Sequence, residues 1–481
     1  MEENSYRQIL KSTTILGGTQ IFNIIISVVR SKLVAVLLGK EGIGIIAMFN
    51  SILNVISSIL ICGINTSGVR EITVVKANPH KVNTIIQSVK WWLLIVGVLG
   101  SLGICFLSSF LSKWSFGTEE YSNYIKILSL ALFFMVFSTK NTIILQSLRM
   151  FNKYAKVNIS SGAISLCFII PIYYYLGVDG IVYSLIVSNL ILYVVSEFYI
   201  KGSIERNTAI QLKDCSIRLK KMLKFGATLT VGSFLGNLVV YLVSIYISSV
   251  DGVEMLGLYN AGMAIVLQYV SLVFNAMSTD YVTRLTAIQS NDNQVRRVVN
   301  LQLDIMLLII SPLLMILIVY LPIGVLMLYS KEFLDIIPFM RWVILSVFFQ
   351  AASWPIGYIS FAKGDVKFFF IVECIYRNVF GLITKLIGYK YGGLEGIGLA
   401  ILFDNLCYFL LISYCARKRY FLKIDFSIVK KNLVFLLGIL FFLFSSIYIK
   451  STVLYITAFP FLALLSYKVI VSLKNKLSIS S

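Results

Sequence analysis

The feature that most constrains this chain is the recurrence of apolar runs about 20 residues long. A helix needs roughly 20 apolar residues to cross a hydrocarbon core about 30 Å thick. About 14 such runs occur, and 58% of the 481 residues are apolar while only 13% are charged. Soluble domains are nearer 45–50% apolar and about 25% charged. The chain is therefore predicted to be an all-α polytopic membrane protein, and a soluble enzyme, a disordered chain and a disulfide scaffold are excluded.

The predicted spans follow from the limits of these runs. They are 13–38, 42–64, 85–110, 122–146, 157–176, 180–200, 225–249, 255–277, 301–329, 337–361, 366–388, 396–415, 430–449 and 452–472. Pro312 and Pro322 predict a kink in the ninth span, because proline removes a helical hydrogen bond.

The charge of the connecting segments predicts the orientation. If the N-terminus is cytoplasmic, the inner segments hold 28 of the 42 Lys and Arg residues. The outer connections hold only five, namely Lys40, Lys113, Lys331, Lys390 and Lys450. This bias is the one that the positive-inside rule describes, so both termini are predicted to be cytoplasmic. The net charge of +20 then marks loops beside anionic lipid and gives no reason to expect nucleic acid binding.

An internal repeat divides the chain. An ungapped offset of 213 residues places Gly39 on Gly252 and Gly44 on Gly257, each in a short outer turn between two predicted helices. The offset equals six spans, so both segments share one membrane orientation, as in parallel-repeat transporters. The predicted architecture is two six-helix lobes related by a pseudo-two-fold axis along the membrane normal. Its divisions are 1–204 for the N-terminal lobe, 205–224 for the cytoplasmic interlobe loop, 225–420 for the C-terminal lobe and 421–481 for two extra helices and a tail.

Short segments near these turns have a familiar pattern. They are Lys32–Gly39, Gly42–Ala47, Cys62–Ile64 and Val69–Ile72, with Gly257–Tyr259 and Tyr281–Thr286 in the second lobe. Over roughly residues 5–420, mostly in hydropathy and spacing, the chain resembles the bacterial O-antigen and enterobacterial common antigen flippases, the Wzx family. These belong to the multidrug/oligosaccharidyl-lipid/polysaccharide exporter superfamily. The resemblance implies a central cavity between two bundles, alternating access, and a cavity lining formed largely by helices one, two, seven and eight.

Charges deep inside the spans are the candidate functional residues, because an ionisable group in lipid is costly and usually faces a bundle interior. The deep set is Arg30, Lys32, Lys140, Glu373, Arg377 and Asp404. Four of the six are cationic, and fixed positive charge offsets the desolvation of phosphate oxygens. We therefore predict that a diphosphate contacts Arg30, Lys32, Lys140 and Arg377.

A structural interpretation of the same charges stays open. Glu373 and Arg377 are four residues apart and can neutralise each other on one helix. Asp404 can pair with Arg377 or Lys385, or can carry a coupling proton or sodium ion. Seven further charges near span ends are expected to snorkel to the interface. These are Lys90, Lys126, Glu197, Asp304, Arg341, Lys385 and Lys468.

The resulting functional prediction is a flippase, and hence not an enzyme. It would move an undecaprenyl-pyrophosphate-linked oligosaccharide repeat unit from the cytoplasmic to the outer leaflet of a bacterial inner membrane. Membrane lipids, a polysaccharide polymerase and a chain-length regulator are the expected partners, and no cofactor, metal or nucleic acid is expected. The alternatives are a drug or cation antiporter of the same superfamily and a flippase for the peptidoglycan lipid precursor. A glycan polymerase would need a large outer loop, whereas every outer connection here is about a dozen residues or fewer.

Overall fold

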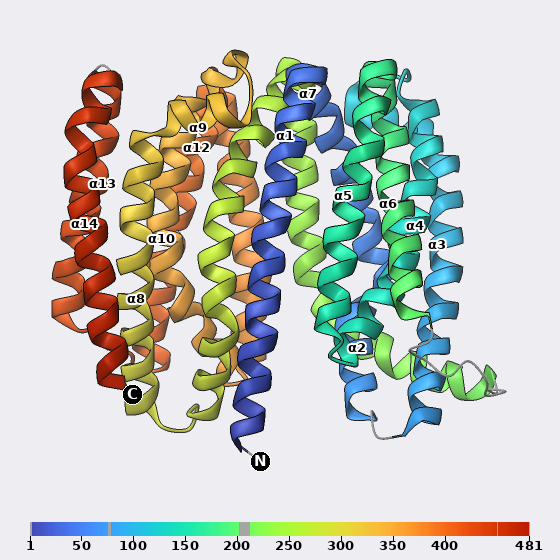
Figure 1. The fold of residues 1–481 in the computed structure, drawn as a ribbon, viewed down its shortest axis with the longest axis horizontal. Helices are drawn as coiled ribbons and strands as arrows, with labels where there is room; N and C mark the ends of the chain where they lie inside the picture. The colour runs from blue at the N-terminus through green and yellow to red at the C-terminus, as the bar shows by residue number, and fades with distance from the viewer. Residues whose placement is uncertain (1, 76–77, 202–211, 450, 481) are drawn as a thin grey trace. The chain divides into compact units, whose positions relative to one another are not determined.

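The computed structural model describes residues 2–75, 78–201, 212–449 and 451–480 (Figure 1). Within these ranges the chain is helical apart from short connections and contains no strand. Nine helical segments in the same ranges are long and apolar enough to cross a membrane. The predicted all-α fold is confirmed, while the count of fourteen spans stays a prediction.

The helices fall into two compact units, Met1–Gly257 and Leu258–Ser481. The first contains α1 (Glu2–Ile61), α2 (Ile64–Val74), α3 (Pro79–Phe116), α4 (Ser122–Ser147), α5 (Phe151–Leu176), α6 (Gly180–Ile200) and the first part of α7 (Leu212–Ala287). The second contains the rest of α7, then α8 (Asp292–Val319), α9 (Leu321–Leu328), α10 (Ile337–Ala362), α11 (Val366–Phe369), α12 (Arg377–Arg419), α13 (Phe426–Tyr448) and α14 (Ser451–Ser480). The predicted division at 205–224 stays a prediction.

In the first unit, α4 is the most enclosed helix. It packs against α3, α6 and α2, and α1 packs against α5 (Figure 1). Of the most apolar stretch of α4, 61% is buried, against 28% for α3. Helix α4 therefore forms the core of this unit, and polar side chains that it carries must find partners inside protein.

Three long helices are broken at glycines with positive φ. The φ/ψ angles are 64°/−160° at Gly39 in α1 and 83°/177° at Gly252 in α7. In α12 the break lies at Gly392 and Gly393, where Gly393 has a φ of 54°. Side chains disfavour positive φ, so these breaks need glycine. Helices α1 and α7 each consist of two helices joined at equivalent positions of the 213-residue offset.

A reciprocal close contact joins these two breaks within the first unit. A Cβ atom on Gly44 would lie 2.0 Å from the carbonyl oxygen of Val253, and one on Gly257 would lie 1.9 Å from that of Lys40. Because 40 and 253, like 44 and 257, differ by 213 residues, each contact is the repeat image of the other. The turn of α1 and the turn of α7 thus pack backbone against backbone with local two-fold pseudo-symmetry.

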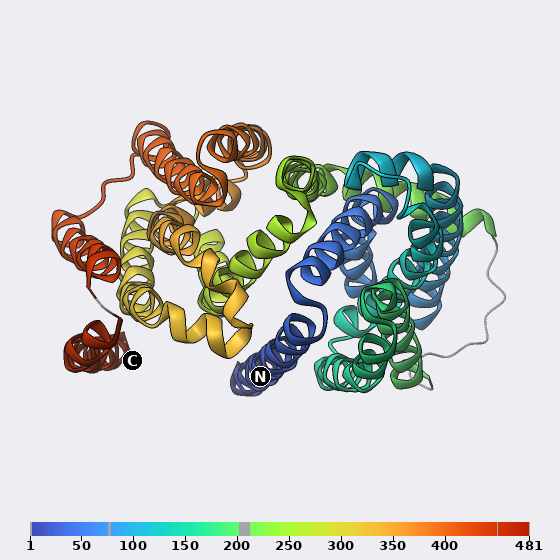
Figure 2. The same cartoon turned by 90° about the horizontal axis from the view of Figure 1, so that it is seen from above.

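In the second unit, α8 is the central helix. Its most apolar stretch is 72% buried, and α10, α13 and α14 pack around it (Figure 2). Helix α8 continues past Pro312 and ends at Val319. A new helix, α9, then begins with Pro322 in its first turn. The kink predicted for 301–329 is therefore a break at Tyr320, since proline fits the first turn of a new helix better than a helix interior.

Candidate functional site

One set of polar contacts in the second unit lies along α12 and the π-helical turn that precedes it. Residues Phe370–Tyr376 form this turn, which the sequence pattern did not predict. π-Helical turns are rare and often occur at functional sites. Glu373 and Arg377 are four residues apart on one face, and Lys385 follows eight residues after Arg377. The second half of α12 brings Asp404 and Tyr408 to this face, because the two halves approach closely at Gly388 and Gly396.

Glu373 is the centre of the first group. Its Oε2 atom lies 3.6 Å from the Arg377 guanidinium, and the buried Tyr408 hydroxyl donates a hydrogen bond to its Oε1 atom. The Arg377 guanidinium also lies over the Tyr408 ring, 4.9 Å from its centroid. Gly357 on α10 makes room, since a Cβ atom there would lie 2.9 Å from both Glu373 and Tyr408 oxygens. The i, i+4 pair expected between Glu373 and Arg377 is present, and 37% of the Arg377 side chain remains exposed.

Asp404 and Lys385 form the second group. A Cβ atom on Gly381 would lie 3.0 Å from Asp404 Oδ2 and 3.5 Å from Lys385 Nζ, so both charged ends converge on this glycine. Asp404 is 8% exposed, and its Oδ1 atom has no hydrogen-bond partner among the described residues. Of the two bases considered for Asp404, Lys385 converges with it at Gly381. Lys385 therefore has a buried acid beside it, and interfacial snorkelling is not needed to explain its position.

In the first unit, Lys140 on α4 is held by a polar group from α6. Its Nζ atom lies 3.0 Å from Glu197 Oε2, which also accepts a hydrogen bond of 3.1 Å from the Asn141 amide. The same amide donates to Ser196 at 2.8 Å, and Lys140 Nζ lies 5.1 Å from the Phe137 ring centroid. Lys140 is 7% exposed, so its charge is balanced inside the unit.

Arg30 and Lys32 lie on α1, and both side chains are half-buried. Arg30 makes no hydrogen bond or ion pair with any residue that the structure describes. It is the deep cation whose charge is least balanced within its own unit. A guanidinium whose charge is not balanced in this way can bind a phosphate through two parallel hydrogen bonds.

Of the predicted deep charges, Glu373 and Arg377 pair with each other, while Lys140 and Asp404 lie beside charges from outside the deep set, Glu197 and Lys385. Two residues that the sequence placed at the interface, Glu197 and Asp304, are instead partners of Lys140 and Lys431. Their depth was the available signal. Lys140 and Glu197 lie six and three residues from the inner ends of the fourth and sixth predicted spans, so their depths are compatible with a pair.

Solved structures identify the fold as that of the multidrug/oligosaccharidyl-lipid/polysaccharide exporter superfamily. The lipid II flippase MurJ in an inward closed conformation is 16% identical, with a TM-score of 0.71 over 98% of this chain and 99% of its own. An inward-facing multidrug resistance transporter of the MATE family is 14% identical, with a TM-score of 0.66 over 85% of this chain and 94% of its own. At these identities the likeness establishes the fold alone.

The sequence comparisons identify the family. A family model described as polysaccharide biosynthesis protein matches residues 33–338, more than half of the chain, and the chain belongs to that family. A Shigella flexneri protein named as a candidate O-antigen transporter is 23% identical over 365 residues, 74% of this chain and 85% of its own length. The resemblance drawn from the short motifs is confirmed, and the chain is a multi-pass membrane protein.

Proposed function

We propose that this protein is a flippase for a lipid-linked glycan. Its cargo is an undecaprenyl-pyrophosphate-linked oligosaccharide repeat unit, which it moves by alternating access from the cytoplasmic to the outer leaflet of a bacterial inner membrane. The observation that carries the proposal is family membership over residues 33–338, supported by the relative named for O-antigen transport. The deep cations add the reason for a diphosphate, because phosphate oxygens entering a membrane protein need fixed positive charge.

The diphosphate is assigned first to Arg30. Its guanidinium has no partner among the described residues, so binding a phosphate there breaks no existing ion pair. Lys32, Lys140 and Arg377 complete the proposed set. Lys140 and Arg377 already have Glu197 and Glu373 beside them, so each contributes by exchanging part of that interaction for the cargo.

Translocation breaks no covalent bond, so the proposed activity is not enzymatic. The residues have only to hold the charged headgroup, shield it from lipid and release it on the other side. Asp404, with one buried oxygen unpartnered, is the proposed site for a coupling proton, and Glu373 is the second candidate. A polysaccharide polymerase acting on the outer leaflet would receive the product, with a chain-length regulator as a further partner.

The test is complementation of a strain that lacks this gene and has lost its surface glycan. Arg30→Ala should reduce surface glycan about tenfold or more at normal membrane levels of protein, because a charge-assisted hydrogen bond contributes about 1.5–3 kcal/mol. Arg30→Lys should keep part of the activity, since charge remains while the two-pronged contact is lost. Lys126→Ala, which removes an exposed base from the same unit, is the matched control. Full glycan in Arg30→Ala would overturn the site, and rescue of peptidoglycan precursor export without glycan rescue would overturn the cargo.

A further inference from the structure

A cavity of about 470 Å³ lies between the first turns of α8 and the start of α13, inside the second unit. It is separate from the polar groups along α12. Its lining consists of Asn293, Arg296, Arg297, Asn300, Leu301, Asp304, Asp425 and Ile428. Both segments belong to the loops whose basic residues predict a cytoplasmic position. The cavity would therefore open at the inner headgroup layer.

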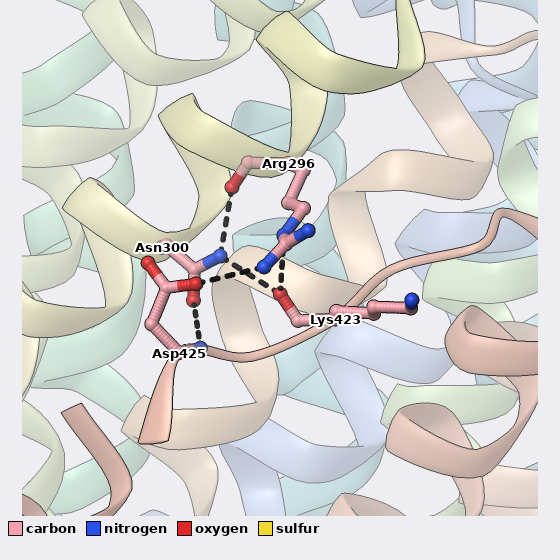
Figure 3. A network of polar contacts seen from close by, with 4 residues as sticks. All are labelled: Arg296, Asn300, Lys423 and Asp425. Carbon is pink, nitrogen blue, oxygen red and sulfur yellow. Dashed lines mark hydrogen bonds and ion pairs between the residues drawn. The ribbon is translucent and has the colours of Figure 1, made fainter. Parts of the chain in front are cut away.

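One buried amide fixes the floor of this cavity. Asn300, 4% exposed, donates hydrogen bonds of 3.0 Å to the Arg296 and Lys423 carbonyl oxygens. Its own carbonyl oxygen accepts a 3.1 Å hydrogen bond from the Asp425 backbone. Figure 3 shows the Arg296 side chain extending toward the segment from Lys423 to Asp425. These contacts hold the entry of α13 against α8, so the cavity walls are pre-formed.

The acids at this cavity already have partners. Asp425 lies 3.0 Å from Arg296, whose Nε atom also donates to the Lys423 carbonyl at 3.1 Å. Asp304, 8% exposed, lies 2.7 Å from Lys431. Arg297 is exposed and has no hydrogen bond or ion pair with any described residue. The charge left available to a ligand is therefore positive, and the same chain segment as Asp425 and Ile428 also carries the exposed Lys423 and Lys430.

One wall of the cavity is apolar. Leu301 on α8 is 41% exposed, and Ile428 belongs to the first turn of α13. The N-terminus of α13 carries a partial positive charge, and the Asp425 side chain does not cap it. A ligand that satisfies both walls carries an anionic group and an adjoining apolar part.

We propose that this cavity binds the phosphate headgroup of an anionic glycerophospholipid. Arg297 takes the phosphate, the first turn of α13 faces it, and the acyl chains lie along Leu301 and Ile428. Basic pockets between helices on the cytoplasmic side are the usual place for such headgroups. The bound lipid bridges α8 and α13, which gives the two C-terminal helices a role in anchoring the second unit to its bilayer. The inference depends on the predicted orientation, and it does not depend on the transported cargo.

Thermal unfolding of the purified full-length protein in uncharged detergent tests this site. Phosphatidylglycerol should raise the apparent Tm, whereas phosphatidylcholine at the same mole fraction and inorganic phosphate should not. Arg297→Gln should need about tenfold more phosphatidylglycerol for the same rise, because one charge-assisted contact is lost. Native mass spectrometry should show the matching loss of retained lipid.

Arg417→Gln is the control, because it removes an exposed arginine that does not line the cavity. It should respond to phosphatidylglycerol as the unaltered protein does. An equal response of Arg297→Gln and the unaltered protein would overturn the site. An equal effect of phosphatidylcholine would overturn the anionic headgroup, and an equal effect of inorganic phosphate would overturn the lipid. All of these results are independent of transport.

Discussion

The deep charges in this chain differ from one another in how fully opposite charge within the same unit balances them. Lys140 is buried against Glu197, and Arg377 shares Glu373 with the Tyr408 hydroxyl. Arg30 has no such partner among the described residues. Since an unbalanced charge in a membrane protein is costly, its retention points to a ligand. This difference among residues sets the order in which we assign the proposed diphosphate.

The Lys140–Glu197 pair can be tested as a double-mutant cycle. Glu197→Gln leaves a buried ammonium without its anion, so we expect a loss of about 2 kcal/mol in unfolding free energy. Lys140→Met combined with Glu197→Gln should recover most of that loss, since neither charge is then stranded. Thermal unfolding in detergent measures both. A loss in the double variant equal to the sum of the losses in Glu197→Gln and Lys140→Met alone would show that the pair does not couple.

Acid should weaken a polar clamp at the predicted inner end of the second unit. Burial raises the pKa of the Asp365 carboxyl, but hydrogen bonds from Tyr420 at 2.8 Å and Arg419 at 2.5 Å lower that pKa below its ordinary value. An aspartate pKa is about 3.9 in the unfolded chain. The clamp therefore stabilises the fold above that pH, and its contribution is lost as the pH falls through the folded pKa.

The clamp predicts the behaviour of Asp365→Asn. At neutral pH this variant should lose on the order of 1 kcal/mol. Its apparent Tm should fall less than that of the unaltered protein when the pH is lowered from about 5 to 3. Glu332→Gln, at an exposed acid, should follow the unaltered protein. An equal fall in apparent Tm for Asp365→Asn and the unaltered protein on acidification would contradict the clamp.

Sequence spacing predicted some of these contacts and missed others. Glu373 and Arg377 are neighbours on one helix, so their spacing alone predicted the pair. Lys140 and Glu197 come from different helices, and their pairing depends on how α4 packs against α6. The pattern of charge along the sequence does not determine which helices pack together. Matched depth in the membrane only limits which charged residues can pair.

At the scale of elements, glycines determine where the long helices break and how closely the resulting turns pack. The offset of 213 residues predicted equivalent turns at Gly39 and Gly252, and the structure has matching breaks there. The π-helical turn at Phe370–Tyr376 has no comparable sequence signal, because one extra residue in a turn leaves the apolar run intact. Pro322 was assigned a kink, but it begins a new helix.

The reciprocal turn contact predicts that Gly44→Ala and Gly257→Ala both destabilise the protein. Each new methyl group would lie about 2 Å from a carbonyl oxygen of the other turn, so the turns must separate. We expect each variant to lose about 1–3 kcal/mol of stability, the usual cost of overpacking. Thermal unfolding measures the loss.

Gly103→Ala on α3 is the matched control for the turn variants. A Cβ atom there would have no neighbour within 4 Å, so alanine should be neutral or should stabilise the helix by up to about 1 kcal/mol. Unchanged stability of both turn variants would show that the contact is looser than the structure indicates.

At the scale of the whole molecule, the superfamily fold is established by comparison, while the orientation is predicted from charge alone. Hydropathy predicted an all-helical membrane protein, because an apolar run of sufficient length has few other stable arrangements. Cargo could not be derived in the same way. The buried charges proposed to contact the cargo include Lys140, whose partner Glu197 lies far away in the chain.

Cysteine labelling tests the predicted orientation. In a variant whose seven native cysteines are replaced by serine, Glu120→Cys lies in a predicted outer turn and Arg417→Cys in a predicted inner segment. Both positions are exposed. A membrane-impermeant maleimide should label Glu120→Cys in intact spheroplasts and Arg417→Cys only after lysis. The opposite pattern would invert the assigned direction of transport.

The central claim is that an unpaired guanidinium on α1 holds a diphosphate headgroup while its lipid changes leaflets. Proteoliposomes containing the purified protein and an undecaprenyl-pyrophosphate-linked oligosaccharide test it most directly, with an external glycosidase reporting the glycan on the outer leaflet. We predict that the unaltered protein exposes the glycan initially protected inside the vesicles, and that Arg30→Ala exposes it no faster than vesicles without protein. Equal rates for Arg30→Ala and the unaltered protein would contradict the account.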